Sequence, residues 1–425
     1  MFELETMDNG LRIVTAHNAD APSATALVMY GVGSRFETAE QCGIAHFAEH
    51  MFFKGTERRP TARDISVEID GIGGEFNAFT GKEYTGYYVK CAAEHLALAV
   101  DVLQDQLLHS KFDAEEIERE KGVIIEEMNM YRDTPMRYIG NVYDELMYGD
   151  QPLGWDIVGT EQVIRGADRN LFMSFLDRWY TANRCVVGLS GNVSNEARDL
   201  VRSSFSGIRA ANEGTRPEAA WEQHGPRVQV YHKASDQAHI AIGLRAPGFL
   251  HEDRYPIAVL NAILGGGMSS RLFVEVRERL GLCYYVRSMH DSYTDTGSFL
   301  VMAGVDTERI DLAITTIINE LWKILAEGPD EQEFTKAKNY LKGRFVLGIE
   351  DPRGLIMYGV RKEAIEDGLR EPAETLAAFD AVTIEDVQRV ARSLLNPDML
   401  NLAVLGPFED EERFLQLLHP TVVAV

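Results

Sequence analysis

Apolar and polar positions follow two different patterns along this chain, one typical of strands and one typical of helices. Five stretches are rich in β-branched and aromatic residues and are bounded by turn residues, which is typical of β-strands. These stretches are residues 11–18, 23–33, 85–92, 238–248 and 297–305. Three longer stretches repeat apolar residues every three or four positions, which is typical of helices. They cover residues 94–109, 113–133 and 311–325. Because strands follow one another without a helix between them, the pattern predicts an α+β fold with mostly antiparallel sheets covered by helices.

One arrangement of elements occurs twice. In the first half a helix ends before Asn183, and an apolar strand, Gly191 and another helix follow. Asn396 and Gly406 stand at the matching places in the second half. The two copies are separated by about half of the chain, which indicates an internal duplication. We therefore predict two homologous domains, each with a mostly antiparallel sheet covered by helices.

The length of the chain also supports a division into domains. At 425 residues it is too long for a single compact core. Between the two copies, glycine, proline and acidic residues replace the apolar pattern, which is typical of a linker. The predicted division is an N-terminal domain over 1–210, a linker over 211–226 and a C-terminal domain over 227–425.

The charge of the chain narrows its possible partners. Asp and Glu number 66 against 42 Lys and Arg, and the net charge is −24. Such a balance argues against nucleic acid or an anionic membrane as a partner. It favours cationic ligands such as basic peptides if the acids line a cavity. A solvated acidic surface that maintains solubility is the simpler interpretation.

The apolar runs and the cysteines bear on the compartment. No run of about eighteen apolar residues exists, so we predict no membrane span. The N-terminus lacks a basic stretch followed by an apolar one, as a secretory signal would have. Four cysteines show no disulfide-framework spacing. We predict a cytoplasmic protein with reduced thiols.

Residues 43–56, GIAHFAEHMFFKGT, contain a candidate metal site. On a helix, positions i, i+3 and i+4 lie on one face, so His46, Glu49 and His50 point the same way. Two imidazoles at this spacing can bind one zinc ion, and a glutamate beside them suits a general base. This is the HxxEH order, the inverse of the commoner HExxH. The alternative is a structural role for two histidines on an apolar helix.

The predicted helix over residues 113–133 is rich in glutamate and offers candidates for a third metal ligand. Glu120 and Glu127 are seven residues apart and share a face, whereas Glu126 points about 100° away from Glu127. Val123 and Ile124 lie one turn before Glu127, which favours an inward face. A buried carboxylate is costly unless it is paired or bound to a metal. We therefore predict Glu127 as the ligand and Glu120 as an acid that orients a histidine. A solvated acidic helix is the alternative.

These motifs resemble those of a known family. GIAHFAEHMFFKGT, GGEFNAFTGKEYTGYYVK, EKGVIIEEMNM and LGGGMSSRLFVEVRERLGLCYYV are similar, in this order, to segments of the pitrilysin (inverzincin, M16) zinc metallopeptidases. The resemblance covers essentially the whole chain and is strongest to the half-length branch that includes mitochondrial processing peptidase and its bacterial homologues. It implies one Zn²⁺ per chain held by His46, His50 and Glu127. It also implies Glu49 as the base for zinc-bound water and Glu120 as the supporting acid.

The resemblance implies how a peptide is held. An extended substrate adds as a further strand to an exposed edge strand, and Arg277 and Tyr284 contact the substrate backbone and the oxyanion. The substrate-binding strand residues are Asn77, Ala78, Phe79 and Thr80. The implied activity is a zinc-dependent endopeptidase that hydrolyses peptides or short unfolded polypeptides inside a dimeric chamber. Because longer family members are four-domain clamshells, the two-domain chain is expected to form a homodimer whose active sites are shared between chains.

Two other functions fit parts of the pattern. One is a catalytically inactive or partner-dependent subunit of a heterodimeric processing peptidase or assembly complex. The intact HxxEH, Glu127 and Arg/Tyr set argues against it. The other is a lyase-type metalloenzyme, since S-ribosylhomocysteine lyase also uses an HxxEH order, but such chains are much shorter. The similar-looking CAAEH, with Cys91, Glu94 and His95, is interpreted as a strand end that enters a helix.

Overall fold

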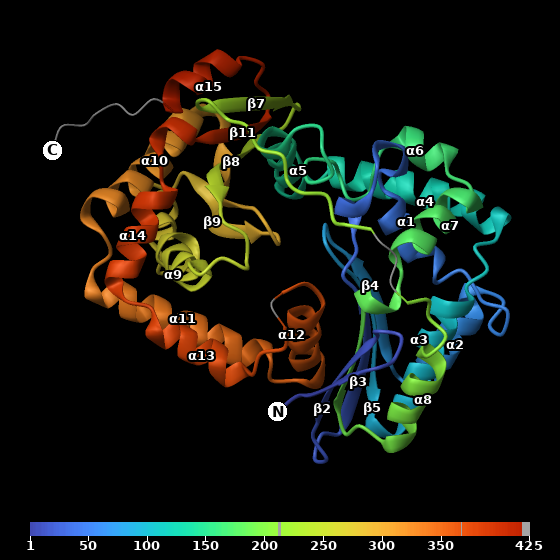
Figure 1. The fold of residues 1–425 in the computed structure, drawn as a ribbon. Helices are drawn as coiled ribbons and strands as arrows, with labels where there is room; N and C mark the ends of the chain where they lie inside the picture. The colour runs from blue at the N-terminus through green and yellow to red at the C-terminus, as the bar shows by residue number, and fades with distance from the viewer. Residues whose placement is uncertain (211–213, 367, 419–425) are drawn as a thin grey trace. The chain divides into compact units, whose positions relative to one another are not determined.

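The computed structural model describes residues 1–210, 214–366 and 368–418 (Figure 1). The chain forms two compact units, and each unit is assembled from three separate segments. Unit 1 comprises Met1–Asn129, Asp156–Pro217 and Val346–Pro372. Unit 2 comprises Met130–Trp155, Glu218–Phe345 and Ala373–Val425. The units therefore differ from the continuous ranges 1–210 and 227–425, because each half of the sequence contributes one segment to the unit formed mainly by the other half. Of the predicted linker 211–226, residues 211–213 lie outside the described part.

Unit 1 is built around a six-stranded sheet in the order β1-β2-β6-β3-β5-β4. Its neighbouring strands are antiparallel except for β2 and β6, which are parallel. The strands are β1 Glu3–Thr6, β2 Arg12–His17, β3 Ser23–Tyr30, β4 Glu75–Thr80, β5 Thr85–Ala92 and β6 Cys185–Gly191. The α-helices are α1 Ile44–Met51, α2 Ala62–Gly71, α3 Leu96–His109, α4 Ala114–Arg132 (in unit 1 up to Asn129), α6 Glu161–Gly166, α7 Arg169–Trp179, α8 Asn195–Phe205 and α12 Pro352–Ile365. The 3₁₀ turns are η1 Ser34–Phe36, η2 Ala39–Gln41, η3 Ala93–His95 and η4 Ala182–Arg184.

Unit 2 is built around a five-stranded sheet in the order β7-β11-β8-β10-β9. Here β7 and β11 are the parallel pair. The strands are β7 Arg227–His232, β8 Gln237–Ala246, β9 Cys283–Ser292, β10 Gly297–Asp306 and β11 Asn401–Gly406. The α-helices are α5 Pro135–Tyr148, α9 Arg254–Gly265, α10 Ile310–Glu327, α11 Glu331–Gly348 (in unit 2 up to Phe345), α13 Pro372–Ala381, α14 Ile384–Leu394 and α15 Glu411–Leu418. A π-helical turn, η5 Phe273–Arg279, and the 3₁₀ turns η6 Thr307–Arg309 and η7 Pro397–Met399 complete the unit. The predicted α+β fold with two mostly antiparallel sheets is confirmed.

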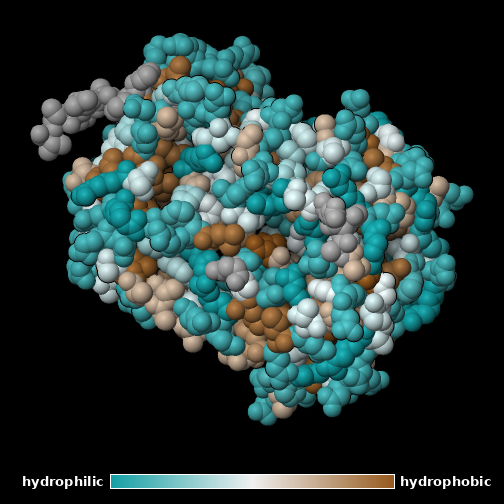
Figure 2. All heavy atoms as spheres, in the orientation of Figure 1, coloured by the Kyte–Doolittle hydropathy of each residue, from teal (hydrophilic) through white to brown (hydrophobic). Residues whose placement is uncertain are grey.

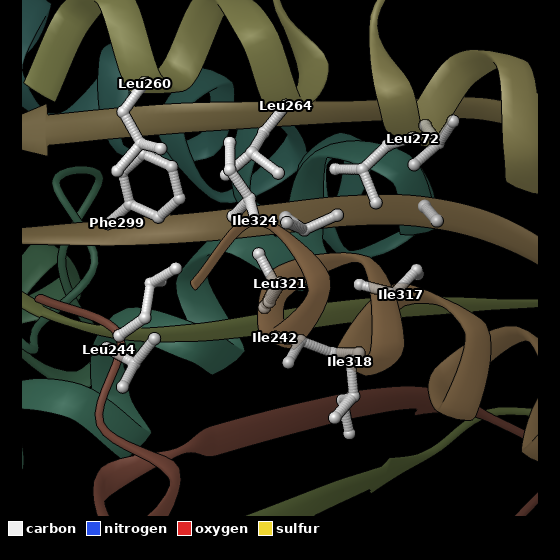
Figure 3. Packing of buried hydrophobic residues seen from close by; sticks show 14 of the residues in the cluster. Ile242, Leu244, Leu260, Leu264, Leu272, Phe299, Ile317, Ile318, Leu321 and Ile324 are labelled. Carbon is white, nitrogen blue, oxygen red and sulfur yellow. The ribbon is translucent and has the colours of Figure 1, made fainter. Parts of the chain in front are cut away.

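The central strands of unit 2 are apolar on both faces. Side chains alternate between faces along a strand, so Phe299 and Val301 of β10 enter the core formed with α9 and α10, whereas Leu300 and Met302 face α5. In Figure 3, Leu260 of α9 points toward Phe299. A strand buried on both faces is a continuous apolar run, which explains the sequence GSFLVMAGV.

Each sheet is covered on one face by a helix from the other half of the sequence. In unit 1, Ile356 and Val360 of α12 pack against Val14, Leu27 and Val186 of the sheet. In unit 2, α5 occupies the corresponding place on β7, β8 and β11. Figure 1 shows α12, in orange, beside the blue strands β2 and β3. Both helices begin with proline. Proline is favourable in the first turn of a helix, because the N–H group that it lacks would have no hydrogen-bond partner within the helix there.

We call α12 and α5 the exchanged helices, because each packs on the sheet formed mainly by the other half of the sequence. Glycines allow these two helices to approach the sheets closely. A Cβ on Gly188 of β6 would lie 2.5 Å from Ile356 Cγ1 and 2.4 Å from Val360 Cγ2. A Cβ on Gly243 of β8 would lie 2.4 Å from the hydroxyl of Tyr143 in α5. These separations are too short for real atoms, so a side chain at either glycine would push the helix away from its sheet.

The surface contrasts with these cores. The face shown in Figure 2 is covered mainly by hydrophilic residues, with hydrophobic atoms in smaller patches between them. This distribution agrees with the high content of charged residues, which is 25% of the chain. None of the helices in the described residues combines the length and the apolar character needed to cross a membrane.

Candidate metal centre

The first helix of unit 1 carries the HxxEH residues. Ile44, Ala45, Phe47 and Ala48 of α1 are fully buried, so its apolar side packs into the unit. On the other side, His46 is 8% exposed, while His50 and Glu49 are partly buried. The helix is only eight residues long and would be marginal without tertiary packing. The buried apolar side therefore fixes where the two imidazoles and the glutamate lie.

Helix α4 brings a carboxylate to the two histidines. Oε2 of Glu127 lies 3.6 Å from Nε2 of His46 and 3.5 Å from Nε2 of His50. One donor atom from each of these three residues lies within 4.8 Å of the other two. Within residues 1–210, 214–366 and 368–418 this is the only such cluster of three histidine, cysteine or acidic side chains. The structure thus brings together the three ligands expected from the sequence.

The donor set suits zinc. Four ligands at about 2.0–2.1 Å in a tetrahedron place their donor atoms about 3.4 Å apart, close to the separations seen here. Two imidazoles and one carboxylate are also a donor set found in catalytic zinc sites. Burial, with the charge of the adjacent His50, lowers the pKa of His46 to about 3. Its imidazole is therefore neutral near pH 7 and keeps a lone pair for a metal.

Glu120 orients one of the histidines. Nδ1 of His50 lies 2.9 Å from Oε1 of Glu120, and since a carboxylate accepts, Nδ1 is the donor. This tautomer leaves Nε2 of His50 directed at Glu127. Nζ of Lys54 lies 2.5 Å from the other Glu120 oxygen. Burial raises the pKa of Glu120, but the hydrogen bonds from His50 and Lys54 outweigh it and hold the pKa below its usual value.

Glu49 lies on the same helix but is held by a different element. The hydroxyl of Thr80, the last residue of β4, donates a hydrogen bond to Oε2 of Glu49. Burial raises the pKa of Glu49, and the Thr80 hydrogen bond opposes this effect. A partly desolvated carboxyl beside a metal cluster has the properties of a general base.

Strand β4 is the last strand in the order of the unit 1 sheet and pairs only with β5 among the described residues. It carries Asn77, Ala78, Phe79 and Thr80, the predicted substrate strand. Its outer edge is therefore available for backbone pairing within unit 1. Because Thr80 is the last residue of β4 and contacts Glu49, this edge ends beside the candidate base.

Arg277 and Tyr284 come together in unit 2. The Arg277 guanidinium lies 5.7 Å from the centre of the Tyr284 ring and 4.6 Å from that of Phe273. Tyr284, the second residue of β9, is 71% exposed. Arg277 is in the π-helical turn η5, a rare geometry that often occurs at functional sites. The pair thus offers a cationic and a phenolic donor at one exposed place.

Several features of the site were not expected from the sequence. Val123, taken as part of an inward face, is 49% exposed, whereas Ile124 is fully buried. The expectation was wrong for Val123 because it lies one position, or about 100°, before Ile124 around the helix. The contacts of Thr80 with Glu49 and of Lys54 with Glu120 were missed. The Lys54 contact had a local signal, since Lys54 follows His50 by four residues, just after the end of α1.

Comparisons with known proteins agree with this geometry. The model "Insulinase (Peptidase family M16)" matches residues 12–161, and the model "Peptidase M16 inactive domain" matches residues 167–341. The uncharacterized zinc protease YmxG of Bacillus subtilis is 36% identical over 407 residues, which cover 96% of this chain and 98% of that protein. The chain belongs to peptidase family M16.

Three further proteins are similar to this chain over nearly their whole length. An uncharacterized zinc protease of Mycobacterium leprae is 38% identical over 411 residues, covering 96% of this chain and 92% of that protein. The crystal structure of a Helicobacter pylori protease has a TM-score of 0.88 at 23% identity, covering 96% of this chain and 99% of that one. A Pseudomonas fluorescens structure described as a peptidase M16 inactive domain has a TM-score of 0.87 at 18% identity, covering 96% of this chain and 99% of that one. At these identities the two structures establish the fold.

Proposed function

We propose that this M16 protein is a zinc-dependent endopeptidase that hydrolyses peptides or short unfolded polypeptides. The observation that carries the proposal is the cluster of His46, His50 and Glu127 with Glu49 beside it on α1. Membership of family M16 and the name zinc protease given to relatives support the class of activity. The HxxEH order and the presence of Arg277 and Tyr284 near each other in unit 2 support the finer assignment.

In this proposal His46, His50 and Glu127 hold one zinc ion per chain. Zinc supplies Lewis acidity, which polarises a carbonyl and acidifies water. Glu49 accepts the proton released when water attacks the scissile carbonyl, and later returns it to the leaving amine. Thr80 holds Glu49 in place, and Glu120 keeps Nε2 of His50 free of a proton.

The substrate lies along β4 in this proposal. An extended peptide pairs its backbone with Asn77–Thr80, so binding tolerates many sequences while side-chain pockets set preference. Since Thr80 contacts Glu49, a peptide aligned with this edge brings one carbonyl beside the base. The net charge of −24 favours basic peptides as the first substrates to examine.

Arg277 and Tyr284 are assigned to the substrate backbone and to the oxyanion formed when water attacks. Their cationic and phenolic donors suit negative charge that develops in a transition state. In the proposed homodimer, each metal site works with Arg277 and Tyr284 of the partner subunit. Mixing tests this: Glu49→Gln and Arg277→Ala chains, each inactive, regain partial activity when they assemble together. Absence of complementation in mixed dimers contradicts the shared site.

The decisive test is cleavage of a quenched-fluorescent basic peptide by zinc-loaded wild type and Glu49→Gln. We expect kcat to fall about 100- to 10,000-fold in the variant, which is the range for loss of a general base, at unchanged zinc content. Glu40→Gln is the matched control, because Glu40 is a solvent-exposed glutamate in the 3₁₀ turn η2, which precedes α1. Equal rates in wild type and Glu49→Gln contradict the assigned base.

Absence of cleavage by wild type and variant alike favours the alternative function, a partner-dependent or inactive subunit of a heterodimeric complex. That outcome is followed by co-purification of the chain with its partner from its source cells. We also propose a cytoplasmic location, which cell fractionation tests directly.

A further inference from the structure

A buried acidic side chain, Glu37, contacts the metal helix at its N-terminal end. Glu37 is 3% exposed, and each of its two oxygens accepts a backbone N–H from the start of α1. Gly43 N lies 2.8 Å from Oε2, and Ala45 N lies 2.7 Å from Oε1. The residue at the helix boundary, Gly43, has no side chain to cap the helix. Glu37 therefore does the work of a cap from six residues away.

The two metal-binding histidines differ in how their rings are held. His50 is fixed through Nδ1 by Glu120, the usual kind of outer partner for a metal ligand. Nδ1 of His46 is buried and has no hydrogen-bond partner in the described part of the chain. The position of the His46 ring depends instead on its backbone, which is adjacent to Ala45. The contact of Glu37 with Ala45 thus lies next to the ligand that lacks a partner of its own.

The backbone around Gly43 leaves little freedom for α1 to shift. Gly43 has φ of +94°, and a Cβ there would lie 2.7 Å from Gly159 Cα and Val158 O. The segment that carries Glu37 is itself anchored to the turn after β4. Arg35 N donates to Lys82 O at 2.8 Å, and Arg35 Nη1 lies 2.7 Å from Glu83 Oε1. These contacts hold the segment that carries Glu37, so its hydrogen bonds to Gly43 and Ala45 restrict the position of the helix.

We propose that Glu37 is a positioning residue of the metal centre, which holds the N-terminal turn of α1 and thereby aims His46 at the metal. The inference rests on the proposed function, since it assumes that His46 is a zinc ligand. It adds to that function a specific residue that touches neither metal nor substrate. Loss of Glu37 weakens zinc binding through His46 while the Glu120 contact with His50 remains.

The chemistry of Glu37 agrees with a dedicated role. Burial raises the pKa of Glu37 to about 8, while the N–H groups of Ala45 and Gly43 and the charge of Lys82 oppose this effect. With this pKa the carboxyl is largely protonated near pH 7, and its hydroxyl oxygen keeps a lone pair that can still accept an N–H, so both contacts hold in either form. Glutamine keeps the length of the side chain but replaces one acceptor oxygen by an NH₂ donor. It can therefore satisfy only one of the two N–H groups.

The test is zinc release from the purified holoenzyme to a coloured chelator, which reports affinity independently of peptidase activity. For Glu37→Gln we expect zinc affinity about tenfold below wild type, within the range for outer partners of metal ligands. Glu37→Asp is too short by one methylene to reach both N–H groups, so we expect its zinc affinity to fall at least as far. If Glu37→Gln does not fold, the aspartate variant carries the test, and zinc affinity equal to wild type then overturns the inference.

Two controls separate positioning from loss of stability. Glu40→Gln changes an exposed glutamate nearby and keeps wild-type affinity. Asp105→Asn removes a buried carboxylate of unit 1 that pairs with Thr56 and Arg59 and not with α1. This variant lowers the melting temperature but keeps zinc affinity. If it weakens zinc as much as Glu37→Gln at equal loss of stability, the inference fails. If wild type binds no zinc, the proposed function fails instead.

Discussion

Units 1 and 2 contain sheets with the same strand order, but among the described residues only unit 1 carries the candidate metal centre. The strand order β2-β6-β3-β5-β4 of unit 1 matches β7-β11-β8-β10-β9 of unit 2, with the parallel pair at the same end. In both, the terminal strand packs against an α-helix that precedes it in the chain and is the first α-helix after β3 or β8: α1 packs on β4, and α9 packs on β9. The duplicated scaffold is thus shared, and the candidate metal centre is not.

The difference lies in a few side chains on equivalent elements. Helix α9, RYPIAVLNAILG, contains no histidine or acidic residue. When α4 and α11 are aligned at their first residues, Glu120 corresponds to Ala337 and Glu127 to Arg344. Leu260 and Leu264 of α9 lie in the apolar core of unit 2 (Figure 3). The scaffold is therefore complete without a metal, and the site is an addition to unit 1.

The largest expected effect tests the difference between the two units at Glu127, the carboxylate of the candidate metal centre. Glu127→Ala removes one of the three proposed ligands, and we expect zinc affinity to fall more than about 1,000-fold, since even outer partners cost up to about 100-fold. The counterpart in unit 2, Arg344→Ala, changes an exposed residue and leaves zinc binding intact. Zinc content after dialysis, measured by atomic emission, checks both variants. Retention of zinc by Glu127→Ala removes this carboxylate from the site.

The next effect tests what the two units share, the exchanged helices. Ile356 of α12 and Ile139 of α5 are fully buried at corresponding places. Each change to alanine is expected to cost about 2–4 kcal/mol, as for other buried isoleucines. Urea unfolding measures this loss. Leu347→Ala is the control, because Leu347 is 63% exposed, and its cost is expected within about 0.5 kcal/mol. Equal small losses at all three positions contradict tight packing of the exchanged helices.

A smaller effect is expected where Glu120 supports His50. Glu120→Gln weakens zinc binding about 10- to 100-fold, whereas Glu126→Gln, an exposed neighbour, does not. The pKa of Glu120 is lowered in the fold, so its stabilising contribution is present above the ordinary carboxyl pKa and is lost as pH falls through the lower folded value. Acid titration of the metal-free chain should show this loss in wild type and not in the glutamine variant. Identical acid titrations contradict a charged Glu120.

The smallest expected effect concerns the motif that imitates the site. His95→Ala is expected to leave zinc affinity unchanged and stability within about 0.5 kcal/mol. His95 lies at the end of η3 beside Glu94, with 3.7 Å between Nε2 and Oε1, and it is not part of the metal cluster. Loss of zinc in this variant would show that the CAAEH motif contributes to a site.

Local features of the site could be predicted from the sequence, and tertiary ones could not. The shared face of His46, Glu49 and His50 follows from helical spacing alone, and so does that of Glu120 and Glu127. That α1 and α4 meet was a hypothesis, which rested on the cost of burying the Glu127 carboxylate without a metal and on the resemblance to a family, because nothing in either helix specifies its partner. The Thr80 contact with Glu49 joins an edge strand to a helix, and the Glu37 contact replaces a cap at an unusual spacing. Neither leaves a local pattern.

The fold shows the same limit. The duplication was visible from Asn183 and Asn396, which precede β6 and β11 in the structure. The exchange of α5 and α12 was not visible, because periodicity shows which side of a helix is apolar but not which sheet it covers. Pro135 and Pro352, each at the start of an exchanged helix, were a matching signal that marks equivalence without revealing the exchange.

The exchanged helices also determine when the protein can finish folding during its synthesis. All strands of the unit 1 sheet have left the ribosome once residue 191 has emerged, but α12 follows only with residues 352–365. Until then Val14, Leu27 and Val186 lack the helix that covers them. Nascent chains with such uncovered apolar surfaces are prone to aggregate and are natural clients of chaperones. Translation of most of the second half must therefore precede completion of the unit that carries the candidate metal centre.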